Sequence, residues 1–308
     1  MAGAHILVIG AASVDVKGRA YRELQPGSSV PGDITLSFGG VGRNVAENLA
    51  RLGQPTVLIS AVGRDPFGTQ ILEHTASAGV DIDNVIVDSG HHSAAYVAVF
   101  DEQGSPAVAV DEMDIMNAVT PAHIYRRRGL FKDAATLVLD ANLSVEALSS
   151  AVRTAKSYAV PVAVDTTSPT LAVKLREHLP DLAITMANVT EAGVLCGHVI
   201  AGRNQAIAAA QELVARGVKI AIITLGEEGL CYATARERGY VPAIRCEVVD
   251  FTGAGDALTA AVVYGLVNGF STGEAMRLGV SAATLTLKCA ETVCPTLSLE
   301  RLYDQLVI

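Results

Sequence analysis

The sequence lacks the features that mark membrane proteins, secreted proteins and small proteins held together by disulfides or metals. It contains no run of about 18 or more consecutive apolar residues, so we expect no membrane span. The N-terminus has no basic region followed by an apolar helix and a cleavage site. The five cysteines are odd in number and include no C-x-x-C pair, which argues against a disulfide framework or a zinc site. A reducing cytoplasm is the expected location.

Positive charge is also scarce. The chain has 23 Lys and Arg against 32 Asp and Glu, which gives a formal net charge of −9 at pH 7. An acidic surface repels phosphate backbones, so we expect no nucleic-acid partner. The basic run Arg126-Arg127-Arg128 is expected to be a solvated helix face.

Two common nucleotide-binding motifs are missing. The absence of G-x-x-x-x-G-K-[ST] excludes a P-loop enzyme. The first predicted strand is followed by Gly10-Ala-Ala-Ser13 instead of G-x-G-x-x-G, so a nicotinamide-dependent dehydrogenase loses its main support. It stays a remote alternative, which thermal stabilisation by NAD but not by ATP–Mg²⁺ would favour.

The residues that are present favour one α/β domain over 1–308. Half of the residues are apolar and 18% are charged, which is enough apolar material to bury a core. Short β-branched runs alternate with helical segments, as in a doubly wound, mainly parallel sheet flanked by helices. The predicted strands are 5–10, 56–62, 136–140, 161–165, 182–186 and 219–225. The predicted helices include 43–52, 66–79, 144–158, 203–216 and 256–268.

Two segments interrupt this alternation. Residues 16–38 hold prolines and glycines among short extended pieces, and residues 93–111 alternate in the β manner around a turn. We predict that together they form a small β-structured lid inserted in the α/β core. An exposed edge strand has unpaired backbone N–H and C=O groups that can pair with another chain, so we also predict a homodimer formed through the lid.

The clearest local motif is Asp250-Phe-Thr-Gly253-Ala254-Gly255-Asp256, directly before a predicted helix. Small residues at a helix start leave backbone N–H groups unobstructed, and these donors with the helix dipole make an anion site. Asp256 at that place fits a catalytic base beside the amides that stabilise a phosphate. An ordinary capped helix is the alternative interpretation.

A second glycine-rich motif, Gly39-Gly40-Val-Gly42-Arg43-Asn44, leads into another predicted helix. Its glycines permit close approach of the backbone to a ligand, and the Asn44 amide offers both a donor and an acceptor to hydroxyl groups. Alone, this motif is weak, because glycine-rich turns between strands and helices are common.

Taken together, the motifs resemble the ribokinase-like family of carbohydrate and nucleoside kinases over nearly the whole chain. The family's two signatures are matched by Gly39, Gly40, Asn44, Gly53 and Gly63, and by Gly253 to Asp256. Its Asn-x-x-Glu motif is matched by Asn188 to Glu191, and its Thr-x-Gly-x-x-Gly loop by Thr224 to Gly229.

Within this family the chain resembles the pseudouridine kinase subgroup. The likeness lies in Phe38 to Asn44, in Glu112-Met-Asp-Ile-Met-Asn117-Ala, in Asp165, Ser168 and Lys174, and in Cys289-Ala-Glu-Thr. Two positions depart from the family: Phe251 replaces a small residue or Val, and Ser13 replaces an Asn that often holds a ribose hydroxyl.

The resemblance implies that the γ-phosphoryl group of ATP is transferred to the 5′-hydroxyl of pseudouridine. Asp256 would act as the base, and the amides of Gly253, Ala254 and Gly255 would hold the migrating oxygens. Glu191 would place Mg²⁺ through water. The residues implied to bind the nucleotide are Asn188, Thr224, Gly226 and Gly229. A monovalent cation such as K⁺ is implied at the carbonyls of Asp250 and Thr252.

The resemblance also implies a nucleoside site. Its residues would be Ser13, Asp15, Gly39, Gly40, Arg43, Asn44, Asp111, Glu112, Asp114, Asn117, Ser168 and Lys174. Pseudouridine is a C-glycoside with a free ring N1–H, and a site that pairs this donor rejects analogues without it. The acceptors near 111–117 suit that task, with a solvated acidic turn as the alternative for each.

Two other functions remain open at this point. The same motifs would serve a kinase of another nucleoside or of a free sugar such as ribose. A non-catalytic sugar or nucleotide sensor on this fold is more remote, because such a protein is expected to lose the base, and Asp256 and its glycines are intact.

Overall fold

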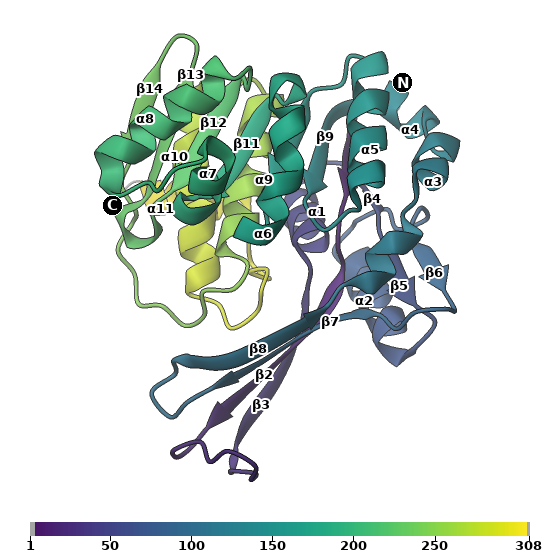
Figure 1. Cartoon of the computed structure of the whole chain (residues 1–308), viewed down its shortest axis with the longest axis vertical. Helices are drawn as coiled ribbons and strands as arrows, with labels where there is room; N and C mark the ends of the chain where they lie inside the picture. Colours follow the sequence, from purple (N-terminus) through teal and green to yellow (C-terminus); the bar gives the residue numbers. More distant parts are fainter. Residues whose placement is uncertain (1–3, 307–308) are drawn as a thin grey trace.

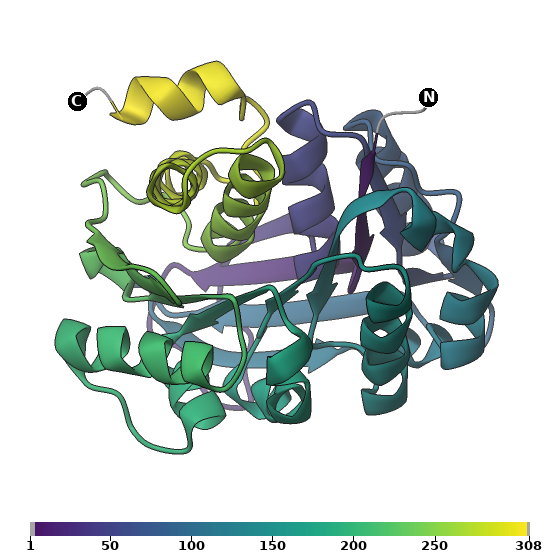
Figure 2. The same ribbon diagram turned by 90° about the horizontal axis from the view of Figure 1, so that it is seen from above.

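Short aliphatic runs, most of them buried on both faces, build an eight-stranded central sheet in the computed structural model, which describes residues 4–306 (Figures 1 and 2). The strand order is β14-β13-β12-β11-β10-β9-β1-β4. Neighbours from β12 to β4 pair in parallel, and β13 and β14 add an antiparallel hairpin at one edge. The strands are β1 His5–Ile9, β4 Thr56–Ile59, β9 Ala134–Asp140, β10 Val162–Asp165, β11 Ile184–Asn188, β12 Ile220–Thr224, β13 Leu230–Thr234 and β14 Arg238–Val241.

Helices cover both faces of this sheet, as the view from above shows (Figure 2). Successive residues of β1 point to opposite faces: Ile6 and Val8 join one buried cluster, and Leu7 and Ile9 join the other. Helices α1 Val41–Arg51, α9 Ala254–Val267, α10 Thr272–Leu287 and α11 Leu299–Leu306 lie on the first side. Helices α5 Val145–Ser157, α7 Val189–Cys196 and α8 Gly202–Ala215 lie on the second. The predicted doubly wound α/β fold is confirmed.

The remaining helices lie in the connections between these strands and helices. They are α2 Pro66–Ser77, α3 Pro121–Arg126, α4 Gly129–Lys132, α6 Pro169–Ala172 and the 3₁₀ helices η1 Asp114–Ala118, η2 Val173–Asp181 and η3 Gly226–Glu228. Over residues 4–306, no helix has both the length and the apolar character needed to cross a bilayer.

The predicted strand 56–62 is wrong as a single element. The chain leaves the central sheet after β4 and forms β5 Ala61–Gly63, which pairs with β6 Ile86–Asp88 in a separate two-stranded sheet. The Ile59 carbonyl accepts from Gly10 in the central sheet, whereas the Ser60 carbonyl accepts from Ile86. The run is buried throughout, so its apolar character did not reveal the change of sheet.

A four-stranded sheet projects from the body of the molecule (Figure 1). Its order is β3-β2-β7-β8, formed by β2 Ser13–Ala20, β3 Gly32–Gly39, β7 Ala94–Phe100 and β8 Pro106–Glu112. Alternation gives it two unlike faces. Asp15 and Lys17 lie on one, with their cross-strand neighbours; valines, Ile34 and Leu36 lie on the other.

Candidate active site

Four polar residues end neighbouring strands of the central sheet. Asp140, Asp165, Asn188 and Thr224 are the last residues of β9, β10, β11 and β12, and the register pairs Asp140 with Asp165 and Asn188 with Thr224. Because these strands are parallel, the four residues meet at one sheet edge, where ligands bind in open α/β folds. Asp140 and Asp165 were not predicted as site residues, although each ends a predicted strand, and that position was the available signal.

Asp140 is a structural carboxylate. Its Oδ2 accepts from the amides of Ala11 at 2.7 Å and Gly42 at 3.0 Å, and its Oδ1 accepts from the Asn142 amide at 2.9 Å. The side chain is buried, and burial raises its pKa. Asp140 thereby joins the end of β1 to the start of α1.

The start of α9 supplies the predicted anion site. The helix begins at Ala254, two residues earlier than predicted, so Ala254 and Gly255 lie in its first turn and Gly253 is the N-cap. No side chain caps this turn, which leaves its first amides available. Gly253 has φ 79°, and a Cβ there would lie 1.8 Å from the Thr292 carbonyl oxygen, so only glycine fits.

Asn44 connects the second glycine-rich motif to Asp256. Its Nδ2 donates to Asp256 Oδ2 at 2.6 Å, and its Oδ1 accepts from Arg43 Nη2 at 2.5 Å. Since Arg43 fixes the oxygen, the amide nitrogen must face Asp256. Arg43 itself is fully buried and also donates to Glu47 and to the carbonyls of Phe38 and Gly39. Arg43, predicted as a substrate contact, therefore lies behind Asn44 and positions it.

A cavity of about 180 Å³ collects the acidic groups. It is lined by Val41, Asp165, Thr167, Met186, Ala187, Asn188, Glu191, Thr224, Gly255, Asp256, Leu258 and Thr259. Burial, reinforced by the Asp165 carboxylate, raises the pKa of Asp256 to about 8. Burial, reinforced by Glu191, raises the pKa of Asp165 to about 6. The pair is thus a base of near-neutral pKa in a site with surplus negative charge.

The chemistry of the cavity suits a magnesium ion. Glu191 and Asn188 form a capping box at the start of α7, and Glu191 Oε2 also accepts from Thr166 Oγ1 at 2.6 Å. Asp165 Oδ2 accepts from Thr259 Oγ1 at 3.0 Å. One cavity is lined by side-chain oxygen atoms of Asp165, Asn188 and Glu191. Mg²⁺ prefers oxygen ligands and often binds them through waters that it retains.

Asp15, predicted to bind ribose, is buried in the four-stranded sheet beside the site. Its Oδ1 accepts from Ser13 Oγ at 3.2 Å, and burial raises its pKa. A Cβ on Gly39 would lie 2.3 Å from Asp15 Oδ1, so this glycine makes room for the carboxylate. Gly40, with φ 89°, precedes α1 and packs equally closely on the Ala11 carbonyl.

The four residues predicted to recognise the nucleoside base do not lie together in the structure. Asp111 shares a face with Asp15, with Tyr96 between them in register, whereas Glu112 alternates to the opposite face. Asp114 and Asn117 are exposed in η1.

Two predicted substrate residues make hydrogen bonds within the protein. Ser168 caps α6 by accepting from the Leu171 amide at 3.4 Å. Lys174 Nζ donates to the carbonyls of Ala141 at 3.1 Å and Leu143 at 3.0 Å. These contacts hold both side chains on the loops that follow β9 and β10.

The predicted nucleotide loop follows β12. Gly226 is exposed, and η3 carries the chain to Gly229, which has φ 106°. A Cβ on Gly229 would lie 2.1 Å from the Val241 carbonyl oxygen, and the Leu225 amide donates to the Gly229 carbonyl at 2.8 Å. The loop is therefore a tight turn directly after Thr224, which lines the cavity.

The Asp250–Thr252 segment is contacted by a lysine that the sequence did not single out. Lys17 Nζ, from β2, lies 2.6 Å from Asp250 Oδ2 and 2.5 Å from Thr252 Oγ1. Burial pushes the pKa of Asp250 upward, but the Lys17 and Thr252 hydrogen bonds outweigh it and hold that pKa below its ordinary value. The carbonyls implied for a monovalent cation belong to this same segment.

The comparison with known families agrees with this geometry. The model of the pfkB family of carbohydrate kinases matches residues 4–297. The chain belongs to this family. It is accordingly a phosphotransferase with an alcohol as acceptor, and the predicted ribokinase-like resemblance is confirmed.

Individual relatives cover nearly the whole pfkB kinase. Pseudouridine kinase of Escherichia coli is 33% identical over 296 residues, 96% of this chain and 94% of the relative. Guanosine-inosine kinase of Exiguobacterium acetylicum is 31% identical over 292 residues, 93% of this chain and 95% of the relative. The structure of Arabidopsis thaliana ribokinase complexed with ribose and ATP has a TM-score of 0.89 at 23% identity, with 99% of each chain covered.

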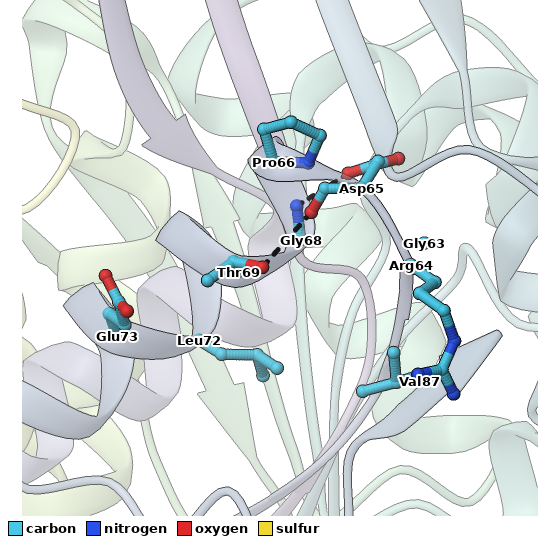
Figure 3. A pocket seen from close by; sticks show the side chains of 9 residues that line it. All are labelled: Gly63, Arg64, Asp65, Pro66, Gly68, Thr69, Leu72, Glu73 and Val87. Atoms are coloured by element: carbon cyan, nitrogen blue, oxygen red, sulfur yellow. Dashed lines mark hydrogen bonds between the residues drawn. The ribbon is translucent and has the colours of Figure 1, made fainter. Parts of the chain in front are cut away.

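A larger cavity of about 490 Å³ in the kinase lies away from these residues, between β5, β6 and the start of α2 (Figure 3). Asp65 is one of its lining residues, but the Asp65 carboxylate caps α2 through the Gly68 amide at 2.7 Å and accepts from both Ser93 Oγ and the Ser93 amide. These contacts stabilise the local fold. The smaller cavity, where acids and free amides converge, is therefore the candidate active site.

One more cluster in the kinase has metal-binding residue types. Cys196, His198 and Glu212 place ligand atoms within 4.8 Å of one another. The Arg216 guanidinium, however, donates to Glu212 and to the Cys196 carbonyl, and burial raises the pKa of the Cys196 thiol to about 11. An ion-pair network that ties α7 to α8 accounts for this cluster.

The buried base of the kinase predicts a specific pH dependence of stability. Folding raises the pKa of Asp256 from 3.8 to about 8, so the folded state binds this proton more tightly and loses stability as pH rises through that window. Asp256→Asn removes the charge, and we expect its melting temperature to exceed that of the wild type by roughly 2 °C or more near the upper end of the window. The gain should vanish at about pH 4. Thermal unfolding of both proteins, with the exposed Asp114→Asn as control, tests this; a variant that melts at or below the wild type at high pH contradicts it.

Proposed function

We propose that this kinase transfers the γ-phosphoryl group of ATP to the 5′-hydroxyl of pseudouridine. The observation that carries the proposal is the 2.6 Å hydrogen bond from Asn44 to Asp256, beside the uncapped start of α9. It joins a side chain suited to ribose hydroxyls to the base, so an acceptor held by Asn44 and Asp15 presents its 5′-hydroxyl to Asp256. The 33% identity to the pseudouridine kinase of Escherichia coli supports the choice of nucleoside.

The reaction follows from these positions. The acceptor oxygen attacks the γ-phosphorus, its proton passes to the Asp256 carboxylate, and the bond between the γ-phosphorus and the β,γ-bridging oxygen breaks to release ADP. A pKa near neutrality suits a base that must take up this proton and later release it to water. The amides of Gly253, Ala254 and Gly255 face the migrating oxygens and stabilise their charge.

The nucleotide lies on the other side of the transferring group. Thr224, Gly226 and Gly229 would hold it. Mg²⁺ would be held by Asn188, Glu191 and Asp165, with water between Glu191 and the ion. When bound, Mg²⁺ neutralises phosphate charge next to a carboxylate-rich cavity. ATP is supported by the likeness to a ribokinase whose structure holds ribose and ATP. We include K⁺ at the Asp250 and Thr252 carbonyls, and a cytoplasmic location, which suits an ATP-consuming enzyme with five free cysteines.

The base of the nucleoside is held by the polar face of the four-stranded sheet, which acts as a lid. Asp111 is the acceptor we propose for the N1–H of pseudouridine, because it shares that face with Asp15 and is separated from it by Tyr96 alone in register. Closure of the lid excludes water that otherwise hydrolyses ATP.

The opposite face of the lid supports a homodimer. Ile34, Leu36, Val97, Val108 and Val110 are 45–78% exposed there. Together they make one apolar patch on a sheet with free edges, and such patches mark association sites. A second copy of the chain, related by a twofold axis, would cover the patch with an identical one.

The function is tested by ADP release with ATP–Mg²⁺ against pseudouridine, uridine, cytidine, adenosine, inosine, ribose and fructose. We expect pseudouridine to lead uridine by at least ~10²-fold in kcat/KM, because uridine leaves the N1–H acceptor unpaired. If kcat/KM is highest with inosine or ribose, the proposed kinase reaction stands and the proposed substrate, pseudouridine, is wrong. ADP release that stays at the acceptor-free rate with all seven compounds would contradict the proposal.

The base is tested by Asp256→Ala and Asp256→Asn. Both should lower kcat by at least ~10³-fold, because general-base catalysis and placement of the acceptor are lost together. Binding of ATP–Mg²⁺, measured by calorimetry, should stay within about threefold, because the nucleotide contacts remain. The exposed Asp304→Asn, outside every proposed site, is the matched acidic control. Near-normal turnover in either Asp256 variant refutes the assignment.

The homodimer is tested by charge on the apolar face. Val97→Asp combined with Val110→Asp should convert a dimer to a monomer in sedimentation or light scattering, since paired carboxylates buried in the interface repel. Thr35→Asp, which adds one charge to the opposite face, is the control and should stay dimeric. A wild-type protein that is monomeric at every concentration measured contradicts this prediction.

A further inference from the structure

Lys17 is a cation in a region dominated by carboxylates. Four carboxylates are buried at or near the proposed site and a fifth, that of Asp165, is half-buried. The buried four are Asp15, Asp140, Glu191 and Asp256. The proposed site must nevertheless accept a triphosphate, and a positively charged side chain would offset the repulsion between the triphosphate and these carboxylates. Two other nearby cations are committed elsewhere, Arg43 to Glu47 and Lys174 to two carbonyls of the loop after β9.

The position of Lys17 couples the lid to the catalytic loop. It lies on β2, two residues beyond Asp15 and on the same face of the sheet. Its ammonium contacts residues 233 and 235 positions later in the chain, Asp250 at 2.6 Å and Thr252 at 2.5 Å. The side chain of Lys17 is only 11% exposed, so solvent screens this contact less than it would a surface ion pair.

The contact continues into the backbone that forms the anion site. Asp250 uses one oxygen for Lys17 and the other for the Thr252 amide at 2.8 Å. Thr252 is followed by Gly253, whose left-handed conformation lies against the Thr292 carbonyl and sets the start of α9. The orientation of the free amides of α9 therefore depends on a loop whose other end is fixed by Lys17.

We propose that Lys17 is a positioning residue that links closure of the lid over the acceptor to the alignment of the Gly253–Gly255 amides for phosphoryl transfer. The link runs from Asp15, which binds the acceptor, through Lys17 to Asp250 and Thr252. This inference rests on the proposed function, because it assigns the amides to the transferring group. It adds a residue on the lid to the parts that determine turnover.

Kinetics of four variants test the proposal. Lys17→Met, which keeps length and removes charge, should lower kcat and kcat/KM for the acceptor equally, by about 10- to 100-fold, because misaligned Gly253–Gly255 amides stabilise the transition state less. Lys17→Arg should recover activity to within about threefold of the wild type. Asp250→Asn should resemble Lys17→Met, and the double variant should be no slower than the slower single variant, because both remove one link.

The matched control is Arg19→Met. Arg19 lies on the same face of β2, but it is exposed and donates to the Glu102 carbonyl within the lid at 3.3 Å. Its loss should leave kcat within about twofold, as expected of an exposed charge. Lys17→Met turnover as close to the wild type as this control, or Lys17 and Asp250 effects that multiply, overturns the proposal.

A measurement without substrate separates this inference from the proposed function. Hydrogen exchange of the 250–255 backbone should be faster in Lys17→Met than in the wild type, and unchanged in Arg19→Met, because a released loop opens more often. Absent turnover of the wild type with every acceptor refutes the proposed function alone. Exchange that is equal in all three proteins refutes the role of Lys17, whichever reaction the enzyme performs.

Discussion

Repulsion among buried carboxylates is the constraint on which the rest of the structure depends. Parallel strands bring Asp140 and Asp165 to one edge in direct register, and α9 adds Asp256 above them. Isolated carboxylates at this depth are costly, because burial disfavours their charged form. The chain meets the cost in different ways. Asp140 receives backbone amides, Asp165 receives Thr259 and the Thr167 amide, and Asp256 receives Asn44 and keeps a raised pKa.

These different solutions assign different tasks to similar side chains. The carboxylate with the most amide donors, Asp140, is fixed and holds the fold together. Asp256, with a single side-chain donor, retains a pKa of about 8 and is available for proton transfer. Environments that push the pKa values of neighbouring acids apart are a general route to separate roles. In this site, the number of backbone amides around each carboxylate determines which acid is structural.

Sequence patterns predicted the layers of the fold well. Strands and helices are formed by local runs of residues, and the periodicity of apolar residues in such a run shows which element it forms. The strand–helix alternation gave the doubly wound sheet, and the glycine-rich motifs located the start of α9 and the turn before α1. The break of 56–62 at Ser60 escaped, since a run buried on both faces looks the same in one sheet or two. Helix α10 was also missed, as most of its surface is buried and its amphipathic signal is weak.

The site was predictable only as far as its motifs reached. Asn44, Glu191 and Asp256 belong to motifs, and the structure brings Asn44 to Asp256. Arg43 belongs to a motif too, yet it faces inward to Glu47, a direction that composition does not reveal. Lys17 contacts a segment more than two hundred residues away, and without pairing information its strand gives no sign of that neighbour.

The two unlike faces of the four-stranded sheet have a consequence for how this protein can vary in length. Side chains alternate strictly along each strand, so a single inserted residue in β2 would exchange the faces beyond it. Insertion before Asp15 would turn its carboxylate and the Lys17 ammonium outward onto the apolar patch, and would turn valines toward the cavity. Changes of length are therefore confined to the connections at 21–31 and 101–105, which the strands leave free of register. Within this sheet, deletion and insertion tolerance should follow the hairpin ends and stop sharply where pairing begins.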